Sequence, residues 1–444
     1  MIGAERWRRA RSAIAGGATP RVVLAVGYAV FLIYAYPGYM TAEAADQLVD
    51  ARAELFTDWY SPAMSELWWL VEWGITGPFG MLVVQSALLL GGAYHLLRRA
   101  MSPRAAALAA AGVLLFPPVL APIAAIWRDG QMAGFLLAGT AALTSPRRGV
   151  RIVGLGLLVV ACAMRDVAAF AALPVVVVGF AWRDDQRRWT RYPIAVAAWA
   201  VVAIAAAWLN AGLADAVTER PQLALATSDI VGVLRYAGPV GDAELARDLA
   251  GTGLVATHDI QARASQLYNH ADDAMAGPER LFDPPAAPGD RAALLAARRA
   301  LAWHHRGAYL AARWHVFYRT LGLSRATRAG PVYTSLLFSP EHRAATGHAA
   351  THGWIQDRLT RFVQYLGRRF LFHPYLYFIV ALVLLPLAVV RRQRDAAMLL
   401  ASGLACELSL FVLASAPDRS SHWMIVCTAL GIVIMIARRI TARS

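Results

Sequence analysis

Carboxylates crowd a short segment directly after the first long apolar run of the chain. The segment "TAEAADQLVDARAELFTDWYSP" carries five of them: Glu43, Asp46, Asp50, Glu54 and Asp58. On a helix, Glu43 and Asp46 would share one face, with Asp50 one turn further along. Carboxylates this close raise each other's pKa and need a partner, which can be an arginine, a divalent cation or a substrate hydroxyl that one of them deprotonates. The segment is therefore a candidate general-base site, and the alternative is a solvated acidic loop.

Charged residues at three further breaks between apolar runs could complete such a site. Asp129 follows Arg128 in "IWRDG", Arg165 lies in "MRDVAAF", and Arg419 lies in "APDRSSH". Guanidinium groups bind phosphate through paired hydrogen bonds, so Arg165, Arg419 and Arg128 are candidate phosphate ligands. Asp129 is a candidate ligand of a divalent cation. The alternatives are a salt bridge from Asp129 to a loop arginine, and arginines that only extend toward the membrane surface.

The elements that must position these residues are apolar. The chain of 444 residues is 58% hydrophobic and 16% charged, with a mean hydropathy of +0.45. Together with recurrent long apolar runs, this composition predicts an all-α polytopic membrane protein. Ten spans are expected, at about 21–39, 79–97, 104–122, 125–144, 149–164, 167–182, 193–213, 372–390, 396–415 and 422–437. The first run lacks a small-residue cleavage site, so we expect it to remain as a span.

The arginines determine the predicted orientation. All 43 basic residues are arginine, and the formal net charge is +14. They cluster at the ends of apolar runs, which membrane topology explains without a nucleic-acid partner. With ten spans, every arginine-rich connection falls on the side of the N-terminus, which the positive-inside rule makes the cytoplasmic side of a bacterial inner membrane. Both termini are then cytoplasmic, while the acidic segment and the turn at Arg165 and Asp166 face outward.

Three segments follow from this arrangement. Residues 1–213 form an N-terminal transmembrane module with a catalytic first outer loop at 40–78. Residues 214–371 form a hydrophilic, mostly helical extracytoplasmic region, and residues 372–444 form the C-terminal transmembrane helices. In the middle segment, "RAALLAARRALAWHHRGAYLAARWHVFYRTLG" has the spacing of one or two amphipathic helices. Its His304 and His305 are candidates to line an acceptor cleft, and ordinary packing or surface roles are the alternative.

In this order, the motifs resemble the GT-C superfamily of polyprenyl-phosphate-sugar-dependent membrane glycosyltransferases. The family's acidic pair and its Asp-Trp-His-Pro-Pro element resemble "PGYMTAEAADQL" and "TDWYSP". Its later outer loops are similar to "IWRDG", "MRDVAAFAALP", "HHRGAYLAARWHVF" and "APDRSSHW". The chain departs from the pattern because Glu43 stands where relatives have Asp, "WYSP" replaces His-Pro-Pro, and "HHRGAYL" lacks the proline. The departures leave the base open between Glu43 and Asp46.

The resemblance implies inverting transfer of a monosaccharide on the extracytoplasmic face. A hydroxyl of an envelope glycan, lipid or protein would attack a polyprenyl-phosphate-linked sugar while Glu43 or Asp46 accepts the proton. Asp58 would orient the loop or the sugar, and His305 would contact substrate. Two of the arginines would stabilise the leaving lipid phosphate, namely Arg165 and Arg419. A divalent cation at Asp129, Mg²⁺ or Mn²⁺, is the one candidate cofactor.

A transporter or lipid flippase for envelope glycan precursors is the alternative from another class. It would place ionisable residues inside spans and would often show repeated halves. Here the charges concentrate at span ends and the halves differ. A glycan ligase or polymerase would carry its key residues in a large late loop, and a non-catalytic assembly protein would not need charges at four outer loops. The sequence favours the transferase and names neither the sugar nor the acceptor.

Overall fold

Helices make up almost all of the described chain. The computed structural model describes residues 19–58, 60–179, 188–215, 220–250, 252, 260–262, 264, 288–324, 353–414 and 421–441. The two strands among the described residues are each two residues long. The all-α class of a membrane protein is therefore as predicted. The predicted phosphate ligand Arg419 lies outside the described residues.

The first half of the described chain alternates apolar helices with short connecting elements. In order, these are α2 (Pro20–Ala35), β1 (Tyr39–Met40), α3 (Ala42–Ala53), α4 (Pro62–Glu72), α5 (Pro78–Leu97), α6 (Pro103–Leu115), α7 (Pro117–Ile123), β2 (Ala125–Ile126), α8 (Arg128–Leu143), α9 (Arg148–Met164), α10 (Val167–Pro174), the π-helix η1 (Val175–Gly179) and α11 (Arg188–Leu213). Proline stands at the start of α2, α4, α5 and α6. At this position the missing N–H of proline costs no hydrogen bond within the helix, and the fixed φ of its ring suits a helix. Arg165 is extended between α9 and α10, so the chain breaks at the predicted turn.

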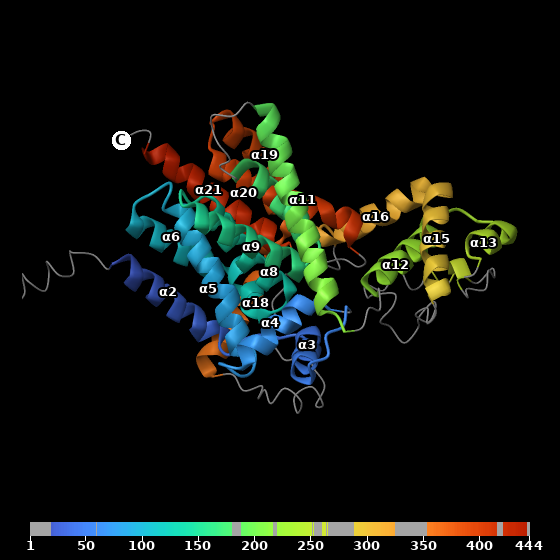
Figure 1. The fold of residues 1–444 in the computed structure, drawn as a ribbon, viewed down its shortest axis with the longest axis horizontal. Coiled ribbons are helices and arrows are strands. Elements are labelled where there is room, and N and C mark those ends of the chain that lie inside the picture. The colour runs from blue at the N-terminus through green and yellow to red at the C-terminus, as the bar shows by residue number, and fades with distance from the viewer. Residues whose placement is uncertain are drawn as a thin grey trace, which may run out of the picture.

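The second half contains a group of amphipathic helices and then three apolar ones. In order, they are α12 (Arg220–Tyr236), α13 (Asp242–Asp248), α15 (Pro288–His304), α16 (Arg306–Thr320), α18 (Trp354–Gly367), the 3-10 helix η3 (Phe370–Phe372), α19 (Pro374–Val390), α20 (Arg394–Leu413) and α21 (His422–Thr441). Figure 1 shows α12, α13 and α15 projecting to the right of the main bundle, which holds α19, α20 and α21.

Four of the described helices are long and apolar enough to cross a membrane: α5, α11, α20 and α21. The pair α6–α7 is bent by 67° and would count as a fifth, broken span. Shorter apolar helices are α2, α10 with η1, and α19. Length and composition thus support a membrane protein, but they do not by themselves establish the predicted ten spans.

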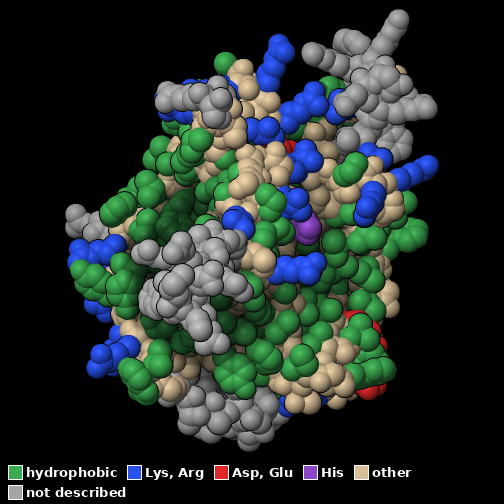
Figure 2. Space-filling model, turned by 90° about the vertical axis from the view of Figure 1, so that its left-hand side faces the viewer, with side chains coloured by type: hydrophobic (Ala, Val, Ile, Leu, Met, Phe, Trp, Pro, Cys, Tyr) green, Lys and Arg blue, Asp and Glu red, His purple; other side chains and the backbone are tan. Residues whose placement is uncertain are grey.

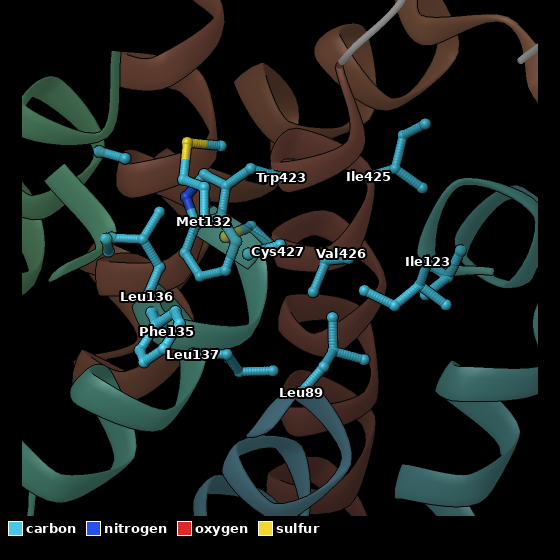
Figure 3. Close-up of a cluster of buried hydrophobic side chains, with 14 of the residues drawn as sticks. Leu89, Ile123, Met132, Phe135, Leu136, Leu137, Trp423, Ile425, Val426 and Cys427 are labelled. Atoms are coloured by element: carbon cyan, nitrogen blue, oxygen red, sulfur yellow. The ribbon is translucent and has the colours of Figure 1, made fainter. Parts of the chain in front are cut away.

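One hydrophobic core joins the N-terminal and C-terminal apolar helices. It extends from Phe31 on α2 to Ala437 on α21. In Figure 3, Trp423 and Val426 of α21 lie among Met132 and Leu136 of α8 and Leu89 of α5. The first and last predicted segments therefore form a single bundle, because neither could bury its apolar faces alone.

Small residues allow α5 and α8 to approach closely. A Cβ on Gly92 would lie 2.7 Å from the Leu137 carbonyl carbon, and one on Gly134 would lie 2.6 Å from the Gln85 carbonyl oxygen. Such contacts are typical of helix interfaces in membranes, where packing rather than hydrophobicity holds helices together. Gln85 also donates from Nε2 to the carbonyls of Ile123 (2.7 Å) and Ala125 (2.9 Å). The strand β2 is thereby fixed to the side of α5.

A second, smaller core lies between α12, α13 and α15. Its link to the bundle passes through Arg313 of α16, whose side chain is only 2% exposed and pairs with Asp229 of α12. Arg298 of α15 also pairs with Asp229, with Nε to Oδ2 at 2.6 Å. Arg313 donates from Nη1 to the carbonyl of Ala414, at the end of α20, at 2.7 Å. A buried ion-pair cluster therefore attaches this helical group to the bundle.

Candidate functional site

A two-residue strand pair brings the starts of α3 and α8 together. Tyr39 and Met40 of β1 pair in parallel with Ala125 and Ile126 of β2. Each strand leads directly into a helix, so the parallel pairing sets the first turns of α3 and α8 side by side. Gly38 precedes β1 with φ +120°, and a Cβ there would lie 3.1 Å from Ile126 Cδ1, so this turn needs glycine.

Glu43 and Arg128 form an ion pair across these two helix starts. The Arg128 Nε lies 2.6 Å from the Glu43 Oε1, and the two side chains are 35% and 30% exposed. The Thr41 hydroxyl caps α3 by accepting from the Ala44 amide at 3.2 Å. An acidic side chain in the first turn is favoured by the helix dipole. Glu43 is therefore a partly exposed carboxylate held beside a guanidinium.

The next residue along α8 forms a second, buried pair. Asp129 is bonded to Arg165 Nη1, and the two side chains are 5% and 16% exposed. Of the three arginines predicted as phosphate ligands, the structure describes Arg128 and Arg165, and each of them meets an acid of another outer loop. The salt bridge that the sequence offered as the alternative for Asp129 is thus present, with Arg165 as the partner. A guanidinium that is largely desolvated binds anions strongly when they approach.

Hydrogen bonds to one carbonyl fix the turn that carries Arg165. Ser61, the N-cap of α4, donates to the Ala163 carbonyl at 2.7 Å, and Asn210 of α11 donates to the same oxygen at 2.9 Å. The Ala63 amide donates to Asn210 Oδ1 at 3.2 Å. The start of α4 and the ends of α9 and α11 are therefore joined beside the Arg165 turn.

The other predicted acids have distinct surroundings. Asp46 accepts a hydrogen bond from the Tyr60 hydroxyl at 2.7 Å. Burial, and then the neighbouring charge of Asp46, raises the pKa of Asp50 above its usual range. Asp58 is half-buried in the connection before α4. Glu43 and Asp46 therefore differ in partner: one faces a guanidinium and the other a phenol.

Gln47 is a polar residue in this region that sequence reasoning missed. It lies one turn after Glu43 on α3, and it is fully buried. Neither atom of its amide has a hydrogen-bond partner among the described residues. A buried amide without a partner costs about 1–3 kcal/mol, so such groups call for a functional explanation. In the sequence, its position four residues after Glu43 could have identified it, because this spacing places both residues on one face of a helix.

A second missed group surrounds Glu407, inside the apolar helix α20. Glu407 is 1% exposed and accepts a hydrogen bond from the Ser421 hydroxyl at 2.8 Å. His422, which begins α21, is also buried, and neither ring nitrogen has a partner among the described residues. An acid inside a span is costly and is commonly functional. The lone Glu407 in "GLACELSLF" was the sequence signal.

The structure does not bring His305 to the acidic segment. Its Nε2 lies 3.5 Å from Glu244 Oε1 of α13, and the neighbouring His304 donates from Nδ1 to Asp248 Oδ2 at 2.8 Å. Both histidines lie at the junction of α15 and α16, and Figure 1 places α13 and α15 well away from α3. The expectation that His305 contacts the same substrate as Glu43 has no support in this geometry.

The residues around Asp129 do not fit a divalent cation. Mg²⁺ and Mn²⁺ require several oxygen ligands and a net negative site. Asp129 is already neutralised by Arg165, and Glu43 by Arg128. A cation at either carboxylate would meet a guanidinium at hydrogen-bond distance. The pairs instead suit an anion that replaces a carboxylate at an arginine.

Comparison with known proteins adds no relative: no family model, curated protein or solved structure matches the chain.

Proposed function

We propose that the chain is a membrane glycosyltransferase that moves a monosaccharide from a polyprenyl-phosphate donor to an envelope acceptor with inversion. The observation that carries this proposal is the convergence at one end of the bundle of two carboxylate–guanidinium pairs, Glu43–Arg128 and Asp129–Arg165. The arginine of each pair is suited to binding the lipid phosphate, and the partly exposed carboxylate of Glu43 is suited to act as the general base. The resemblance of the surrounding motifs to the GT-C superfamily agrees with this chemistry.

Exchange of partners would couple donor binding to base activation. Without a bound donor, Arg128 forms an ion pair with Glu43. The phosphodiester of an arriving donor offers Arg128 two oxygens that share one negative charge, so it competes with the Glu43 carboxylate for the guanidinium. Glu43, once released, would accept the proton of the acceptor hydroxyl.

The chemical step is a single displacement. The acceptor oxygen forms a bond to the anomeric carbon as the bond from that carbon to the phosphate oxygen breaks, which inverts the anomeric configuration. The proton passes to Glu43, and the departing lipid phosphate keeps the electron pair. Arg165 and Arg128 would stabilise its charge. Asp46, held by Tyr60, would support Glu43 or take its role, and Asp58 would orient the loop or the sugar.

Membrane placement is part of the proposal. Ten passes require α8 and α9 to cross the membrane in addition to the four long apolar helices, the bent pair α6–α7 and the three shorter apolar helices. The positive-inside rule then places the termini in the bacterial cytoplasm and the paired charges at the extracytoplasmic face of the inner membrane. The acceptor would be an envelope glycan, lipid or protein, and no nucleic acid is involved.

Deletion of the protein tests this function. Envelope glycans from the deleted and complemented strains would be compared by mass spectrometry, together with the lipid-phosphate fraction. The expected result is loss of one monosaccharide and accumulation of one sugar-linked lipid phosphate, both reversed by the wild-type chain and not by Glu43→Gln. Unchanged glycans and lipid phosphates in the deletion strain would refute the proposal.

One observation favours the second candidate, a transporter or flippase. Glu407 is an ionisable residue buried within an apolar helix, and charges in such positions are typical of transport pathways. Glu407→Gln separates the two functions. A transporter would lose translocation of lipid-linked precursor into the outer leaflet, whereas a transferase would leave that translocation intact and respond to Glu43→Gln.

A further inference from the structure

A groove with an apolar floor and a basic rim lies at the opposite end of the bundle from Glu43. It has a volume of about 690 Å³ and runs between α5, α8 and the start of α9. The floor is made of small and apolar side chains, including Gly91, Ala138 and Leu88. The rim carries Arg98 and Arg147. The groove therefore has an apolar floor and a cationic rim that lie within a few helical turns of each other.

A second pocket of about 590 Å³ adjoins the first. Arg99 and Thr144 line both of them. Six arginines line this second pocket: Arg99, Arg191, Arg391, Arg392, Arg394 and Arg438. Asp395 is the single acid of its described lining, and its Oδ2 lies 3.1 Å from the Arg99 Nε. Six positive charges therefore face one negative charge around a hollow, and a compact anion is favoured there.

The positive-inside rule explains why arginines occur at this end, but it does not require them to surround a hollow. In Figure 2, many arginine side chains gather over the upper part of one face, and hydrophobic side chains cover much of the area below. The Oε1 of Gln393, in the wall of the second pocket, is buried and has no partner among the described residues. A headgroup hydroxyl would satisfy it. Charge, shape and this acceptor point to a ligand with a phosphate, a hydroxyl and a hydrocarbon tail.

We propose that the joined pockets bind an anionic phospholipid, with its phosphate among the arginines beside Arg99 and an acyl chain along the groove floor at Gly91. The ligand is a structural lipid of the membrane leaflet at the arginine-rich end. It is separate from the polyprenyl-phosphate donor proposed at the Glu43 end. Basic pockets between apolar helices are a known way to retain such headgroups. This inference requires a membrane protein and does not depend on the transferase chemistry.

Native mass spectrometry and thermal unfolding of the purified full chain would test the site. Dioleoyl-phosphatidylglycerol is the probe, dioleoyl-phosphatidylcholine is the neutral lipid control, and sn-glycerol 3-phosphate is the headgroup without acyl chains. We expect the anionic lipid to stay bound and to raise the melting temperature, while the other two do neither. Equal binding of phosphatidylcholine, or equal stabilisation by glycerol phosphate alone, would overturn the proposal.

Two pairs of variants separate a built site from general attraction. Arg391→Gln with Arg394→Gln removes two lining charges, and Arg148→Gln with Arg439→Gln removes two exposed charges outside both linings. The first pair should weaken phosphatidylglycerol binding roughly 30-fold and the second much less. Gly91→Leu fills the groove floor, and Gly112→Leu is its match on α6; an added Cβ meets nothing within 4 Å at either position. Equal effects within either pair would contradict the site.

Discussion

Arg128 Nε lies 2.6 Å from Glu43 Oε1, although the two residues belong to different predicted outer loops. The contact exists because β1 and β2 pair in parallel and each leads straight into a helix. Since Asp129 follows Arg128 and binds Arg165, three loops converge through two adjacent residues of α8. This arrangement makes separate predictions for the exposed pair and for the buried one.

Glu43→Gln should abolish transfer and leave the fold intact. The Glu43–Arg128 pair is about a third exposed, and such pairs contribute only about 0–1 kcal/mol to stability. Loss of a general base lowers the rate by about 10²–10⁴-fold. The measurement is sugar transfer from a polyprenyl-phosphate donor by purified protein, with Asp46→Asn assayed in parallel. Glu66→Gln, a half-buried acid of α4, is the control, and wild-type rates for both Glu43→Gln and Asp46→Asn would show that neither is the base.

The Asp129–Arg165 pair should behave differently when one or both partners are removed. Asp129→Leu alone leaves a largely buried guanidinium unpaired, which should cost about 3–5 kcal/mol. Asp129→Leu combined with Arg165→Met should recover most of that loss, because apolar replacements of buried pairs are often neutral. Thermal unfolding measures stability, and the transfer assay measures function. If the double variant also regained transfer, the pair would be structural only.

Replacing Gln47 should raise stability while lowering transfer. Gln47→Met keeps the approximate volume and removes two buried polar atoms that have no partner among the described residues, which should stabilise the fold by about 1–3 kcal/mol. If the amide binds a sugar hydroxyl after a local rearrangement, the same change should raise KM more than it lowers kcat. A rise in melting temperature with unchanged KM would assign Gln47 no role in binding.

Asp50 should make the protein less stable as the pH rises through the acidic range. Burial and the charge of Asp46 raise its folded pKa, so the folded state holds this proton more tightly than the unfolded state. The stabilisation is complete below the unfolded pKa and is lost as the pH rises through the folded one. Asp50→Asn should remove that loss and give a higher melting temperature near neutral pH. If the melting temperature of Asp50→Asn depended on pH in the same way as that of the wild type, the predicted rise in the pKa of Asp50 would be contradicted.

Chelation should leave transfer unaffected. Glu43 and Asp129, the carboxylates of the two pairs at the proposed site, are each paired with an arginine. Transfer measured in excess EDTA should therefore equal transfer in Mg²⁺ or Mn²⁺. Activity that disappears with EDTA and returns with Mg²⁺ would show that the pairs open to bind metal, and would restore Asp129 as a ligand.

The sequence alone determined the class of the protein and many of the residues worth testing. The apolar runs and the arginine clusters are both explained by a lipid bilayer. The bilayer excludes charge from the middle of a helix that crosses it, so the arginines collect at the helix ends. The break at Arg165 and the acids of α3 were visible for the same reason. Helix periodicity also indicated the amphipathic segments of the middle region, since it is a local property.

Only the tertiary structure decided which charges meet. Long-range pairing depends on the register of β1 with β2 and on the close packing of α5 against α8 through Gly92 and Gly134, and neither is encoded within one segment. The tertiary structure also buries Gln47 and Glu407, places His305 beside Glu244 of α13, and joins the first and last predicted segments in a single core. Local patterns report what each helix exposes, whereas contacts between distant segments arise from how all the helices fill space together.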